Sequence, residues 1–136
     1  KADKRGSMPL LAIPSIKRGN PPQRGIMRKI ERAMIQAIID KRNWTSSNTS
    51  VKYDNESGLS QIFLHGHNIA EYGHGDISLA VNNCGYETNT TKSRLNVLIN
   101  FVADPTKNGI FQKNWNWFIT LDGITQSFPC NRWMVI

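Results

Sequence analysis

The segment Thr88 to Asn96, which reads TNTTKSRLN, brings hydroxyls and two cations together where a loop gives way to a helix. Free backbone amides at the start of a helix attract anions. The Thr and Ser hydroxyls, with Lys92 and Arg94, could complete a site for a phosphate. The alternative is a capping turn, in which the hydroxyls satisfy backbone amides and both cations point into water. We take Lys92 and Arg94 as a secondary anion site and keep the capping turn as the alternative.

Three histidines in the segment HGHNIAEYGHGD raise the possibility of a metal site. Side chains two residues apart share one face of a strand, so His65 and His67 could coordinate one ion, with His74 or Asp76 on the next strand. The neighbouring glycines favour turns instead, where polar residues collect for backbone reasons. The histidines are therefore weak metal candidates, and we expect neither a metal nor another cofactor.

The segment QKNWNWF combines aromatic rings with a cation and two asparagines. Alternation along a strand places Trp115 and Trp117 on one face, next to Lys113 and Phe118 in the sequence. An open face could stack nucleic-acid bases or bind a partner, whereas a covered face would belong to the core. We favour the core, because a protein of this size must bury its large apolar residues somewhere.

The net charge of +7 is confined to the first 29 residues, where eight cations face one acid. From Ile30 onward, nine cations balance nine acids. Clustered cations attract polyanions and release counterions from phosphates, so we expect nucleic-acid contact; a solubilising or packing arm is the alternative. The candidate nucleic-acid or anion-binding residues are Lys4, Arg5, Lys17, Arg18, Arg24, Arg28, Lys29, Lys92 and Arg94.

Proline and glycine should keep residues 1–24 out of regular structure, since four of the six prolines lie there. This basic arm is expected to be extended or disordered until it docks. Residues 25–136 then form a single domain, which is long enough to bury a core. No apolar run approaches the roughly 18 residues that a membrane span needs, so we expect a soluble protein without membrane contact.

Two helices are predicted from the spacing of apolar residues. The first spans residues 26–41. The second is capped by Thr90 or Thr91 and ends before Asp104-Pro105. Its predicted buried face consists of Leu95, Leu98, Ile99 and Val102.

Alternating apolar residues predict antiparallel hairpins in the rest of the chain. One hairpin turns at residues 54–58 and the next at 73–75, while residues 45–50 are a loop or the start of a strand. Residues 109–128 are predicted to form two more strands with a turn at Asp122-Gly123. The predicted class is α+β: a small antiparallel sheet packed by two helices, with an extended basic N-terminal arm.

Residues 59–120 carry a recognisable series of motifs. The run LHGHNIAEYGHGDISLAVNNCGYETNTTKSRLNVLI, followed by GIFQKNWNWFI, resembles a small domain family of tailed phages with the motif Gly-aromatic-x-Thr-x-Thr-Thr-basic-x-Arg-Leu-Asn. Here His67 is inserted where the family passes directly to Asn, and Tyr86 holds the aromatic position. The resemblance implies a phage origin and a fold unit, but no reaction, and it does not reach the N-terminal arm.

These features together predict a non-enzymatic phage accessory protein in the cytoplasm of the infected host cell, bound to nucleic acid or to a nucleic-acid-associated host machine. Two alternatives stay open. One is a virion or assembly component whose arm interlaces neighbouring subunits of a homo-oligomer. The other is an inhibitor of a host defence or polymerase protein. An enzyme is disfavoured, because the sequence contains no Ser/His/Asp ordering, Walker loop or GxGxxG motif.

Overall fold

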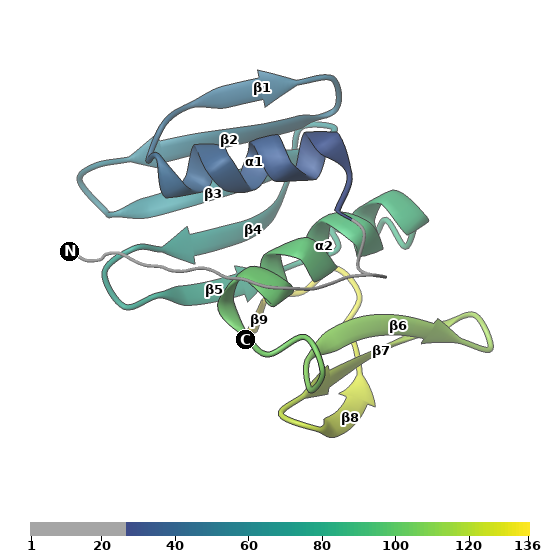
Figure 1. Ribbon diagram of the computed structural model, residues 1–136. Helices are drawn as coiled ribbons and strands as arrows, with labels where there is room; N and C mark the ends of the chain where they lie inside the picture. Colours follow the sequence, from purple (N-terminus) through teal and green to yellow (C-terminus); the bar gives the residue numbers. More distant parts are fainter. Residues whose placement is uncertain (1–26) are drawn as a thin grey trace.

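Residues 27–136 are described by the computed structural model, which confirms the predicted α+β class (Figure 1). The predicted arm, residues 1–24, and its boundary with the domain lie outside the described residues. The elements in chain order are α1 (Lys29–Ile39), β1 (Trp44–Ser46), β2 (Thr49–Asp54), β3 (Leu59–Leu64), β4 (His67–Gly73), β5 (Ser78–Val81), α2 (Asn89–Val102), β6 (Gly109–Lys113), β7 (Asn116–Leu121), β8 (Ile124–Ser127) and β9 (Met134–Val135).

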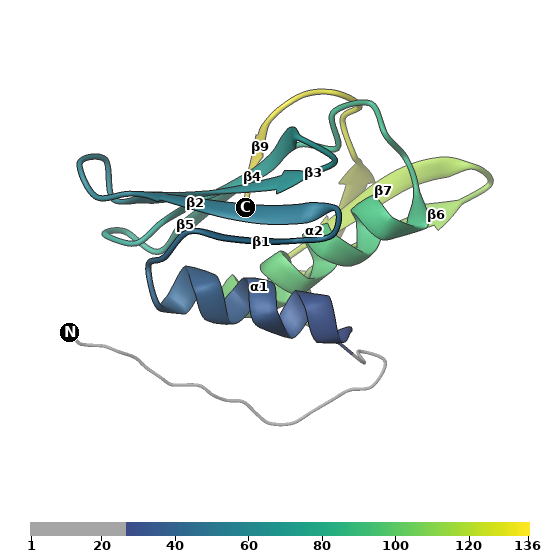
Figure 2. The same cartoon turned by 90° about the horizontal axis from the view of Figure 1, so that it is seen from above.

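The larger sheet has six antiparallel strands in the order β1-β2-β3-β4-β5-β9. Its two central hairpins are β2–β3 and β4–β5, as the sequence predicted. Both helices cover the same face of this sheet (Figures 1 and 2). The three-stranded sheet β6-β7-β8 lies beyond α2, which therefore separates the two sheets.

The hydrophobic core lies between the helices and the covered face of the six-stranded sheet. On β3, Ser60, Ile62 and Leu64 are buried, while the residues between them are only partly buried. Full burial of an aliphatic side chain stabilises the fold by about 1.5–3 kcal/mol, so this layer holds the helices on the sheet. Its fully buried members include Met34, Ile38, Val51, Ile62, Leu79, Leu95, Leu98 and Ile99.

Helix α1 is shorter than the predicted span of 26–41. Arg28 is extended at the N-cap, with φ −69° and ψ 156°, and its backbone amide donates to Glu31 Oε1 at 3.0 Å. The helix ends because Lys41 takes a left-handed conformation, with φ 55°. A side-chain carboxylate that accepts from the N-cap amide is a common way to begin a helix.

Helix α2 is capped two to three residues before the predicted caps. Thr88 is the N-cap, and its Oγ1 accepts from the backbone amide of Thr91 at 3.1 Å. This corrects the expectation that Thr90 or Thr91 caps the helix. Thr88 is extended, with φ −110° and ψ 162°, as an N-cap requires. Of the predicted buried face, Leu95, Leu98 and Ile99 are buried, and Val102 is partly buried.

The three-stranded sheet contains one strand more than predicted. The expected turn at Asp122-Gly123 is present, with φ 50° and 85°. A second two-residue turn at Asn114-Trp115, with φ 52° and 68°, divides the first of the two predicted strands. Positive φ at both central residues is the pattern of a type I′ hairpin. Trp rarely takes positive φ, so the sequence contains no strong signal for this turn.

The edge strands β1 and β9 carry too few residues for a periodic pattern. β1 resolves the open prediction for residues 45–50, since Thr45 pairs with Ser50 and Ser46 with Thr49. β9, which was not predicted, has two residues and pairs Met134 with Val81. No helix in the described part of the chain is long and apolar enough to cross a membrane.

Candidate nucleic-acid interface

The N-terminal ends of α1 and α2 are joined by a buried polar cluster. Arg94 Nη1 donates to Glu31 Oε2 at 2.8 Å, and Ser93 Oγ donates to the same oxygen at 2.6 Å. The other carboxylate oxygen of Glu31 accepts the backbone amide of Arg28. A buried carboxylate needs such partners to offset the loss of water. The cluster therefore holds the beginnings of the two helices side by side (Figure 1).

The side chain of Arg94 is bonded inside the protein and is only 3% exposed. Its Nε donates to Thr49 Oγ1 at 3.0 Å, and Nη2 donates to Asn48 Oδ1 at 3.3 Å. Arg94 thus ties α2 both to α1 and to the start of β2. This placement corrects both interpretations drawn from the sequence, an anion ligand beside Lys92 and a solvated cation.

Other predicted phosphate-binding residues surround this cluster and face outward. Arg28 and Lys29 are exposed at the start of α1, and Lys92 is half-buried one residue before Ser93. None of these three cations forms an ion pair with a described residue. Arg32, one turn further along α1, is exposed and donates from Nη1 to the carbonyl of Met27 at 3.0 Å. We call Arg28, Lys29, Arg32 and Lys92 the basic corner.

The local electrostatics favour an anion at the basic corner. The first turn of α2 has no acidic residue, and Glu31, in the first turn of α1, is matched by Arg94. Cations beside the positive end of a helix dipole are unfavourable unless an anion compensates them. Residue 26 precedes Met27 directly, so the predicted arm joins the fold at this corner. Its candidates Lys4, Arg5, Lys17, Arg18 and Arg24 lie outside the described residues.

The three histidines do not share one site. His65 lies in the β3–β4 turn, with φ 52°, and His67 opens β4 with its ring 4.6 Å from that of Tyr86. His74 follows the other end of β4, roughly 20 Å away at the rise of a strand. The possible site that combines His65 and His67 with His74 or Asp76 is not formed, because β4 keeps its ends apart. Within residues 27–136, no group of three or more His, Cys, Asp or Glu could hold a metal ion.

His74 is partly buried and packs among polar and aromatic side chains. Its Nε2 is 2.8 Å from Ser60 Oγ, and its ring contacts the rings of Tyr53 and Tyr72 edge-on at 5.4 and 4.8 Å. Burial, with a smaller contribution from the positive charge of Lys41, lowers the pKa of His74 to about 4. The imidazole is therefore neutral at physiological pH and acts as a packed, hydrogen-bonded ring.

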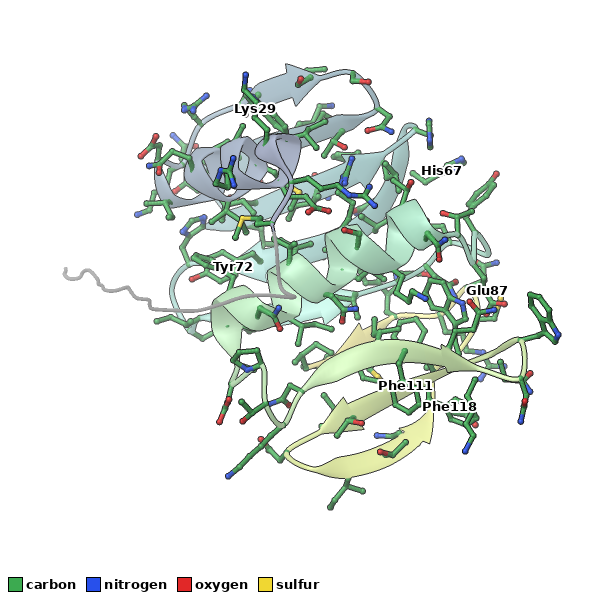
Figure 3. All side chains as sticks on the ribbon, turned by 45° about the vertical axis from the view of Figure 1, so that its right-hand side comes forward. Lys29, His67, Tyr72, Glu87, Phe111 and Phe118 are labelled. Atoms are coloured by element: carbon green, nitrogen blue, oxygen red, sulfur yellow. The ribbon has the colours of Figure 1, made fainter. Side chains whose placement is uncertain are left out.

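The two tryptophans of the QKNWNWF segment lie in opposite environments. Trp117 is 3% exposed and packs against Phe128, whereas Trp115 is 88% exposed. This corrects the expectation that Trp115 and Trp117 share a face, because the turn at residues 114–115 interrupts the strand between them. Phe118 stacks on Phe111, its cross-strand partner (Figure 3). The register places this pair on the face of the sheet opposite Trp117.

Two residues that connect the elements around the site were not predicted from the sequence. Asn96 Oδ1 accepts from the Ile110 amide at 2.7 Å, and its Nδ2 donates to the Ile110 carbonyl at 2.9 Å, which fastens β6 to α2. Glu31 is the other. It is a carboxylate at helical spacing within an apolar stripe, and this signal could have identified it as a buried ion-pair partner; the stripe contains Met34, Ile35 and Ile38.

The model of the Kyanoviridae Gp96 protein family matches residues 27–135. No curated protein and no solved structure matches the chain. The family match extends well beyond the motifs in residues 59–120 and confirms the phage origin that they implied. It includes the basic corner, and the predicted arm, residues 1–24, lies outside it.

Proposed function

Because this chain belongs to the Kyanoviridae Gp96 protein family, a family of phage proteins, we propose that it is a non-enzymatic accessory protein that binds nucleic acid in the cytoplasm of the infected host cell. The observation that supports this function is the separation of charge along the chain. Residues 1–29 carry a net charge of +7, from eight cations and one acid, and the remainder is neutral.

The fold supports the proposal, because it gathers further cations at the start of the described residues, just after the predicted arm. Arg28, Lys29, Arg32 and Lys92 surround the start of α1 and α2, and the acid among them, Glu31, is neutralised internally. A cationic arm on a neutral domain produces an oriented field that draws a polyanion to this end of the molecule. Arg94 is left out of the proposed surface because its guanidinium is bonded inside the fold.

Salt dependence provides the first test. The affinity of the full chain for a labelled oligonucleotide of about 20 nucleotides is measured by fluorescence anisotropy over a range of salt concentrations. We expect the logarithm of the association constant to fall linearly with the logarithm of salt concentration, by about 0.9 per duplex phosphate neutralised. An affinity that does not change with salt would contradict the proposal.

Charge-neutralising variants locate the binding surface. The full-length triple variant Lys17→Gln, Arg18→Gln, Arg24→Gln should bind more weakly and show a smaller salt slope, by about 0.9 for each cation that contacts a duplex phosphate. The matched control Lys41→Gln, Lys52→Gln, Arg132→Gln removes the same charge from the neutral part of the chain and should retain most of the affinity. Equal losses in the two variants would show that binding follows net charge and not the arm.

A further inference from the structure

The β6–β7 hairpin presents three aromatic side chains to solvent. Phe111 and Phe118 are cross-strand partners, with ring centroids 5.6 Å apart and planes inclined by 22° (Figure 3). Phe111 and Trp115 are both exposed, and Phe118 is half-buried. We call these three residues the aromatic platform. It lies outside the basic corner and outside the core.

Trp115 lies in the turn at the tip of the hairpin, and Phe111 and Phe118 occupy the solvent face of the small sheet. Ile110, Trp117 and Ile119 are buried on the opposite face, which belongs to the core. The register places Ser127 beside Phe118, so a hydroxyl-bearing residue borders the aromatic pair. The three-stranded sheet therefore has one face that completes the fold and one face that exposes aromatic rings.

Trp115 is held in an unfavourable conformation at the tip of this hairpin. Its φ is 68°, a value that favours glycine, and its side chain is exposed beyond the end of the sheet. Exposure of a large indole and positive φ both cost free energy, and no contact within the described fold compensates them. Such combinations are concentrated at binding sites, where a ligand covers the exposed surface.

The charge of the hairpin favours a nucleic acid as that ligand. No acidic residue lies between Pro105 and Leu121, while Lys113 directly precedes the turn. Asn114 and Asn116 add exposed amides on either side of Trp115. Aromatic faces, a cation and neutral hydrogen-bonding groups without carboxylates are the groups that hold bases and phosphates of a single strand.

The aromatic platform and the basic corner lie at the same end of the molecule. Asn96 fastens β6 to α2 through Ile110, and β6 then runs toward the end at which α2 begins. Both views show the tip of the β6–β7 hairpin projecting at that end (Figures 1 and 2). One strand of nucleic acid could therefore contact the corner and the platform together.

We propose that the aromatic platform stacks unpaired bases, so that the chain prefers single-stranded over double-stranded nucleic acid. This inference rests on the proposed function: the arm and basic corner attract phosphates of either form, and the platform adds the preference. Trp115 and the Phe111–Phe118 pair receive bases, and Lys113 contacts the backbone. A duplex cannot use the platform, because its bases are already stacked and paired.

The test compares the full chain with Trp115→Ala on oligothymidine and on a duplex of the same length. The variant should bind oligothymidine roughly 5- to 100-fold more weakly, as expected for the loss of base stacking. Its affinity for the duplex should be unchanged. Trp115→Phe should retain most of the single-strand affinity and Trp115→Leu should not, because stacking requires a ring. Ile124→Ala is the matched control, since Ile124 is an exposed apolar residue on the opposite face of the same sheet.

The outcomes separate this inference from the proposed function. If oligothymidine binding depends on the arm and is unaffected by Trp115→Ala, the platform is not a base-stacking site and the proposed function stands. If the full chain binds neither nucleic acid, both fail. If Trp115→Ala instead converts a dimer into a monomer by sedimentation without changing nucleic-acid affinity, the platform is a protein interface and the inference is overturned. Thermal melting checks that the variants fold, and substitution of Trp115 should be tolerated because its side chain is 88% exposed.

Discussion

Glu31 and Arg94, which lie 63 residues apart in the chain, form a buried ion pair with 2.8 Å between Oε2 and Nη1. Both side chains are at most 3% exposed. The pair connects the first turn of α1 to the second turn of α2 and, through Thr49, to β2. The charges of Glu31 and Arg94 therefore neutralise each other inside the protein. The cations that remain around the two helix starts, such as Lys29 and Lys92, face outward.

Removal of one partner of this pair should strongly destabilise the fold. Glu31→Ala or Arg94→Ala leaves an uncompensated buried charge, and we expect a loss of about 3–5 kcal/mol in the free energy of unfolding. Urea denaturation followed by circular dichroism measures the effect. Arg42→Ala is the control, because Arg42 pairs with Asp40 at 3.4 Å on the surface and should cost less than about 1 kcal/mol. Similar losses in all three variants would contradict a special role for the buried pair.

Asn96 should determine how firmly the small sheet is attached. Asn96→Ala removes the two hydrogen bonds to the Ile110 backbone and leaves a buried strand edge unpaired, at a cost of about 1–3 kcal/mol. Amide hydrogen exchange followed by NMR should show faster exchange at Ile110 than in the parent protein. Asn116→Ala, which removes an exposed contact to the Asn114 carbonyl, should leave the exchange of Ile110 unchanged. If the Ile110 amide exchanges as slowly in Asn96→Ala as in the parent protein, Asn96 does not determine how firmly the small sheet is attached.

Stability should fall in mild acid because of His74. The folded pKa of about 4 lies below the ordinary value of 6.5, so the unfolded chain binds the proton more tightly. The contribution of His74 to stability is therefore complete above about pH 6.5 and is lost as the pH falls toward 4. Denaturant titrations between pH 4 and pH 6.5 measure how steeply the free energy of unfolding changes with pH. His74→Gln should reduce this slope. An unchanged slope in His74→Gln would assign the effect to other titratable groups.

Trp115→Gly should stabilise the protein. Glycine adopts positive φ without a steric penalty, and Asn-Gly is a favoured type I′ turn, so we expect a gain of up to about 1 kcal/mol. The melting temperature measures it, with Phe111→Gly as a contrasting variant that should destabilise a strand. A fall in the melting temperature of Trp115→Gly would show that the exposed indole stabilises the hairpin. A more stable variant that binds oligothymidine less well would indicate that stability is sacrificed for binding at this position.

The sequence by itself determined the elements whose signals are local. Helical spacing of apolar residues located α1 and α2 to within a few residues, because burial of one helix face requires that period. The β2–β3 hairpin and the turn at Asp122-Gly123 followed from strand alternation and from a dipeptide that adopts positive φ easily. Charge counting located the basic segment, residues 1–29, without any knowledge of the fold. The predictions of the α+β class and of the phage origin were confirmed for the same reason. Each rests on patterns or motifs that lie within short segments of the sequence.

Only the tertiary structure decided where the functional side chains point. Arg94 and Lys92 are two residues apart, yet the position of Glu31 draws Arg94 inward and leaves Lys92 at the surface. Trp115 and Trp117 are also two residues apart, and the turn between β6 and β7 sends one to solvent and the other to the core. These outcomes depend on partners up to 63 residues away and on a turn without a strong sequence signal. Because these contacts join residues that are far apart in the sequence, local pattern alone cannot assign the directions of the side chains.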